Sequence, residues 1–182
     1  MNIRLLALKI HIPSRIKKKK LEELFVLVVD AFGKPKPTLK GLSYDERLKA
    51  FASYTAEEAE IQIREGQHLE EIKTKLYENA YKLGQKIRDD FRIRSIQEIM
   101  KMSRILYQIL GIDFEGDRDG EVTIKKCFFS HYYSDQVCEL ISSLDEGVAA
   151  GLSEGGKLSF FQKITEGKDC CKAHLVLPEE KI

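Results

Sequence analysis

The four cysteines of this chain all lie between residues 127 and 171, and three of them have neighbours that could support chemistry. His131 follows Cys127 by four residues, and Asp145 follows Cys138 by seven residues, which is about two turns of a helix. An imidazole can deprotonate a nearby thiol, and a helix N-terminus favours the thiolate that results. Cys127, His131, Cys138 and Asp145 therefore form a candidate catalytic set, in which a cysteine attacks and Asp145 with His131 handles protons.

The same side chains also suit a metal ion. Zinc and iron both accept thiolate and imidazole ligands, so Cys127, Cys138 and Cys171, together with His131, form a candidate zinc or iron site. None of these residues has the close CxxC or HxxxH spacing of common metal motifs. For any one cysteine taken alone, a small buried hydrophobic side chain is the more common role, so both interpretations stay open.

Aromatic residues beside the first cysteine predict an apolar ligand pocket. Phe129 and Tyr133 could form its walls, or could simply belong to the core. Alternation along the last predicted strand places Cys171 on the apolar face and Lys172 on the opposite face.

The hydrophobic period changes after residue 120, and this change predicts the elements that carry these side chains. Before it, residues 113–120 are predicted to form an acidic loop. The elements that follow are a strand over residues 122–129, a helix capped by Ser130 or Ser134 and ending at Leu152, and strands over residues 157–165 and 170–177 joined by a turn at 166–169. This β-α-β-β unit would hold a small antiparallel sheet packed on helices.

Helices are predicted for the part of the chain before residue 111. An apolar helix covers residues 21–32, and Ser or Thr three residues before Glu predicts further helix starts at Ser43, Thr55 and Ser95. The helix that begins at Thr55 is predicted to continue to about Phe91, with a bend or a split where Gly66 and Gly84 interrupt the pattern. Its apolar stripe is longer than one small sheet can cover, which predicts a homodimer through this helix.

Composition indicates a globular protein of the α+β class. The chain has 182 residues, of which 43% are hydrophobic and 32% charged, and this length suits one domain over residues 1–182. The domain would consist of a helical half (1–111) and a β-α-β-β half (120–178). A net charge of +1 predicts no nucleic-acid partner, and no apolar run has the length of a membrane span. Cysteines without a signal-peptide cleavage site predict reduced thiols and a cytoplasmic location.

Six short runs of the C-terminal half contain cysteine, acidic and glycine residues in a recurring order. They are residues 127–129, 137–140, 144–147, 151–152, 158–160 and 164–171. In this order the runs resemble the L-2-amino-thiazoline-4-carboxylic acid hydrolase-like family and, more distantly, the related V4R-type small-molecule-binding domains. The resemblance covers about residues 120–177. It implies that Cys127, Cys138, Asp145 and Cys171 occupy the recurring polar positions of the family.

Two functions follow from this resemblance. The first is hydrolysis of a carbon–nitrogen bond in a small cyclic amidine or thiazoline carboxylate, with Cys127 or Cys138 as nucleophile or metal ligand. Lys157 or Lys172 would then bind the substrate carboxylate, although Lys172 stands where the family commonly has an acid. The alternative is a non-catalytic sensor or binding domain that holds a small molecule or a metal.

Overall fold

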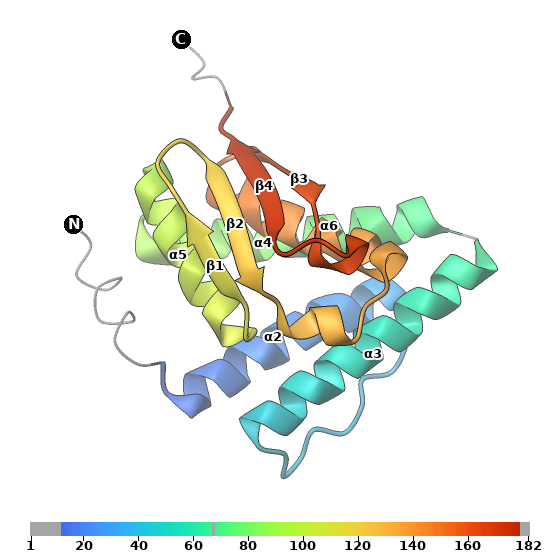
Figure 1. Ribbon diagram of the computed structural model, residues 1–182. Coiled ribbons are helices and arrows are strands. Elements are labelled where there is room, and N and C mark those ends of the chain that lie inside the picture. Colours follow the sequence, from blue (N-terminus) through green and yellow to red (C-terminus); the bar gives the residue numbers. More distant parts are fainter. Residues whose placement is uncertain (1–11, 67, 179–182) are drawn as a thin grey trace.

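The fold is α+β, as predicted, with helices in the N-terminal half and strands in the C-terminal part (Figure 1). The computed structural model describes residues 12–66 and 68–178. The elements in chain order are α2 (Ser14–Phe32), α3 (Tyr44–Glu65), α4 (Leu69–Phe91), α5 (Ile96–Ile109), β1 (Asp113–Gly116), β2 (Glu121–Lys126), η1 (Phe128–His131), α6 (Asp135–Leu152), β3 (Lys157–Gln162), η2 (Ile164–Glu166) and β4 (Cys171–Val176). No helix within the two described ranges is long and apolar enough to cross a membrane.

Helices α2 and α3 pack against each other because both have apolar side chains at helical spacing. Leu21 and Phe25 of α2 are fully buried, and the ring of Phe25 meets that of Phe51 edge-on, with centroids 4.9 Å apart. Ser43 caps α3 as predicted. Its hydroxyl accepts a hydrogen bond from the backbone N–H of Glu46, and the Glu46 carboxylate accepts one from the backbone N–H of Ser43.

The predicted helix start at Thr55 is wrong, because Thr55 lies in the middle of α3. Its side chain is fully buried, and its hydroxyl oxygen is 2.8 Å from the carbonyl oxygen of Phe51, one turn earlier. A hydroxyl engaged with the preceding turn cannot cap a new helix. Helix α3 continues to Glu65 and ends at Gly66, whose φ of +66° is the left-handed value typical of a helix terminus.

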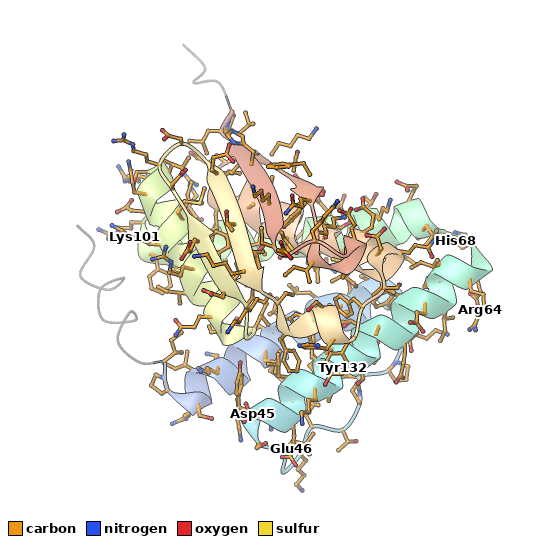
Figure 2. All side chains as sticks on the ribbon, viewed as in Figure 1. Asp45, Glu46, Arg64, His68, Lys101 and Tyr132 are labelled. Atoms are coloured by element: carbon orange, nitrogen blue, oxygen red, sulfur yellow. The ribbon has the colours of Figure 1, made fainter. Side chains whose placement is uncertain are left out.

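The predicted helix over residues 55–91 is therefore two helices, α3 and α4, and α3 ends at Gly66, one of the two glycines where a break was expected. Figure 2 shows Arg64 and His68 at one end of the molecule. The apolar stripe of the second helix, α4, faces the interior of the protein. It packs against α2 and α6, and its buried members are Ile72, Leu76, Ala80, Gly84 and Ile87. Because this stripe is already covered, it no longer gives a reason to expect a dimer.

Helices α4 and α6 approach each other closely because α6 has glycines where they touch. A Cβ atom at Gly147 would lie 2.3 Å from the carbonyl oxygen of Tyr77. A Cβ atom at Gly151 would lie 2.2 Å from the carbonyl oxygen of Tyr81. Both distances are far below a normal contact, so only glycine permits this separation of the helices. Helix α6 therefore packs directly against α4.

The sheet is antiparallel, with strand order β1-β2-β4-β3, and helices α4, α5 and α6 lie on one side of it (Figure 1). In the centre of the sheet, Val122 pairs with Ala173 and Ile124 pairs with Cys171. All four side chains are buried and face the helices, whereas Lys172 is exposed on the other face. The alternation predicted for the last strand is therefore correct.

Residues 113–116, predicted to be part of an acidic loop, form strand β1 instead. Phe114 is buried, and its ring stacks on that of Tyr107 in α5 with centroids 4.7 Å apart. Only the turn that follows keeps the predicted loop character, and there the Asp117 carboxylate accepts two backbone N–H groups. The C-terminal unit thus has one strand more than the sequence predicts.

Two hydrophobic cores result from this arrangement. The first lies among α2, α3, η1 and the N-terminal turns of α4 and α6. The second lies between the sheet, α5 and the C-terminal turns of α4 and α6. Ile112, Cys127 and Val148 pack against both cores. Cys127, one of the residues singled out from the sequence, therefore lies at the junction of the two cores.

Candidate functional site

A cavity of about 150 Å³ lies at this junction. Most of its lining is aliphatic or aromatic, and helices α4, α5 and α6 contribute Leu83, Leu106 and Val148, while the sheet contributes Ile124 and Phe160. A cavity of this volume with apolar walls can hold a molecule of roughly the size of benzene. Apolar walls with a few polar groups are typical of small-molecule sites.

The most distinctive polar feature of the lining is the carboxyl group of Asp145, in the middle of α6. Its Oδ1 accepts a hydrogen bond of 2.8 Å from the Tyr107 hydroxyl, which α5 projects from the other side of the cavity. Burial raises the pKa of Asp145 to about 6, although the bond from Tyr107 acts in the opposite direction. Asp145 therefore carries a negative charge at neutral pH that little in its surroundings stabilises.

Three thiols line the same cavity, those of Cys127, Cys138 and Cys171. Burial raises the pKa of Cys127 to about 12, and it also raises the pKa of Cys138 and of Cys171. The sulfur of Cys171 accepts a 3.3 Å hydrogen bond from the backbone N–H of Ile164. At neutral pH all three side chains are uncharged thiols, and they behave as small apolar parts of the wall.

The thiols do not form the predicted metal site. In residues 12–66 and 68–178, no group of three or more His, Cys, Asp or Glu side chains is arranged to hold a metal ion. Cys127, Cys138 and Cys171 all line one cavity, but without a group of three ligands the described residues do not fit a zinc or iron site.

Phe129 and Tyr133, predicted as pocket walls, both line the cavity. Their rings pack against each other with centroids 5.3 Å apart, and Phe129 also belongs to the first core. The Tyr133 hydroxyl pairs with that of Thr55, which fixes the ring against α3. Figure 2 shows the neighbouring Tyr132 over α3, so the turn after η1 anchors this wall to the helical half.

The structure leaves two predicted site residues outside the cavity lining. His131 ends the 3-10 helix η1, and its side chain is exposed. The short helix η1 lies between the end of β2 and the start of α6, and it places His131 at the surface. Lys172 is exposed on the outer face of β4, where strand alternation directs it away from Cys171. The cavity therefore gives no support to the expectation that an imidazole meets the thiols and the acid.

Two important residues of the site were not predicted. Tyr107 comes one turn after Ser103 on the buried side of α5, and two polar residues on an apolar helix face were a detectable signal. Lys163 follows β3 and lines the cavity, where its ammonium group pairs with the Glu139 carboxylate. A register shift just before Lys163 disturbs the alternation, so no simple pattern indicates its inward direction.

The sequence matches no protein-family model and shows no significant similarity to a curated protein. The resemblance to the L-2-amino-thiazoline-4-carboxylic acid hydrolase-like family therefore stays a prediction, and function is argued below from the geometry of the cavity.

Proposed function

We propose that this protein binds a small, mostly apolar molecule in the cavity between its two cores, without transforming it. The observation that supports this proposal is an apolar cavity of about 150 Å³ with one partly buried carboxyl group, that of Asp145, in its wall. Such a site gives an apolar ligand a large contact area and one polar group to orient it. This corresponds to the alternative function derived from the sequence, a binding or sensor domain.

Binding has more support than hydrolysis. A cysteine hydrolase needs a thiolate, and burial raises the pKa of Cys127 and Cys138, the two thiols predicted as nucleophiles. The imidazole predicted to activate them, that of His131, is exposed and outside the cavity lining. The cavity thus lacks the pair of groups on which the predicted attack depends.

The cytoplasm is the compartment that we propose for this function. All four cysteines are free, and three of them line the ligand cavity. Thiols stay reduced in the cytosol, whereas oxidising compartments favour disulfides. A binding protein with thiols in its cavity wall is best suited to a reducing environment.

Ethylbenzene tests the proposal because it is apolar and not much larger than benzene. We expect saturable binding of one molecule per chain, measured by methyl NMR titration and by a rise in the midpoint of thermal unfolding. Ala149 of α6 lines the cavity, and Ala149→Leu would fill part of it and weaken binding at least roughly tenfold. Ala50→Leu on α3, outside the lining, is the matched control. No saturable binding, or equal affinity in the Ala149→Leu variant, would overturn the proposal.

A further inference from the structure

We infer that the cavity selects a ligand with a cationic nitrogen, which the free oxygen of the Asp145 carboxylate binds while the apolar walls hold the rest of the molecule. This inference rests on the proposed function, because it specifies the chemistry of the ligand that the cavity takes up. It is carried by the position of Asp145, by the partners of the charged groups near it, and by the aromatic walls.

One carboxylate oxygen of Asp145 accepts a hydrogen bond, and the other has no hydrogen-bond partner among the described residues. Its Oδ1 accepts the Tyr107 hydroxyl, and no other hydrogen bond or ion pair reaches this carboxylate from the described part of the chain. Asp145 is only partly buried, and it lines the cavity. Its second oxygen is not one of the fully buried oxygens that lack a partner, so it is accessible to a ligand. The bond from Tyr107 fixes the orientation of the carboxylate and leaves one acceptor for a ligand.

The charged groups around this carboxylate do not neutralise it. Lys163 lies near it in the lining, but its ammonium group is paired with Glu139. Lys20 lies in the lining on α2 and is paired with Glu23 at 2.7 Å. Glu146, the next residue on α6, adds a second negative charge close by. The three lining thiols are uncharged at neutral pH because burial raises the pKa of each. Among the charged side chains of the cavity lining, Asp145 is therefore the one without an ion-pair partner in the described part of the chain.

A cationic nitrogen satisfies this site better than a neutral group does. A buried carboxylate without a counter-charge is unfavourable, and an ammonium group in contact with it would supply both the charge and the N–H donor. Tyr133 and Phe129 provide aromatic faces in the same cavity, and such faces also attract cations. The aliphatic lining then requires that the remainder of the ligand be apolar.

Three ligands of equal heavy-atom number test this inference: ethylbenzene, benzyl alcohol and benzylammonium. The measurement is the affinity of each by NMR titration, for the wild type and for Asp145→Asn. We expect the ratio of the benzylammonium to the ethylbenzene affinity to fall roughly tenfold or more in Asp145→Asn, while the benzyl alcohol ratio changes little. The exposed Asp169→Asn is the matched control and should leave every ratio unchanged.

A pH series on the wild type gives a second measurement that needs no variant. The pKa of Asp145 is about 6, so most molecules carry the carboxylate at about pH 7.5 and roughly one in ten does at about pH 5. Benzylammonium binding should weaken roughly tenfold over this interval, and ethylbenzene binding should not. If ethylbenzene binds while benzylammonium responds neither to pH nor to Asp145→Asn, or benzyl alcohol responds equally, the inference is wrong and the proposed function stands. If none of the three ligands binds, both fail.

Discussion

Replacing Asp145 with Asn should change the way in which the stability of the protein depends on pH. Folding raises the pKa of this carboxyl from 3.8 to about 6, mainly by burial, so the folded chain binds the proton more tightly than the unfolded chain. The resulting stabilisation is complete below about pH 4 and is lost as the pH rises through about 6. A pKa change of this size corresponds to about 3 kcal/mol. Asn has no charge at any of these pH values and can still accept the Tyr107 hydroxyl.

Urea unfolding of the wild type and of Asp145→Asn, from about pH 4 to about pH 7.5, measures this effect. Relative to the wild type, the variant should gain about 2.5 kcal/mol of unfolding free energy as the pH rises over this range. Asp169→Asn removes an exposed carboxylate in the turn before β4 and should follow the wild type within about 0.5 kcal/mol. Parallel curves for Asp145→Asn and the wild type would refute the argument that burial perturbs this group.

Two further substitutions test the packing around the cavity. Gly147→Ala would place a Cβ atom 2.3 Å from the carbonyl oxygen of Tyr77, so we expect a loss of about 3 kcal/mol or more in denaturant unfolding, and an unchanged midpoint would contradict the close α4–α6 contact. Thr55→Val removes the hydroxyl that pairs with Tyr133 and should cost about 1–3 kcal/mol, because the Tyr133 hydroxyl loses its partner. Adding Tyr133→Phe should recover part of this loss, and strict additivity of the two losses would exclude the pairing.

The parts of the fold that the sequence predicts well are those with strong local signals. Helix α6 begins after Ser134, whose hydroxyl accepts a hydrogen bond from the backbone N–H of Val137, and this was one of the two predicted caps. Strand β1 was missed because its Asp- and Gly-containing sequence is typical of a loop. It becomes a strand through non-local contacts, since it pairs with β2 and Phe114 packs on Tyr107. Single-sequence patterns do not contain such contacts.

The same distinction applies to the site. Spacing along α6 correctly placed Cys138 and Asp145 on one helix face, and both line the cavity. Proximity in sequence misled the prediction for His131, because η1 turns this side chain outward. Tyr107 lies 38 residues before Asp145, and only the packing of α5 beside α6 brings the two together. Residues on one element can thus be grouped from sequence, whereas partners from separate elements require the fold.

Unfavourable features concentrate at the cavity, and this argues that a ligand completes it. The cavity of about 150 Å³ is lined mainly by apolar side chains, and the charge of Asp145 in its wall is disfavoured by about 3 kcal/mol at neutral pH. The close contacts of Gly147 and Gly151 with α4 show that the same helix packs tightly outside the cavity. Ala149 also lies on α6 and presents only a methyl group to the cavity, where a larger side chain would fill the space. An apolar cation would suit this site, since its body would contact the apolar lining and its charge would neutralise the carboxylate.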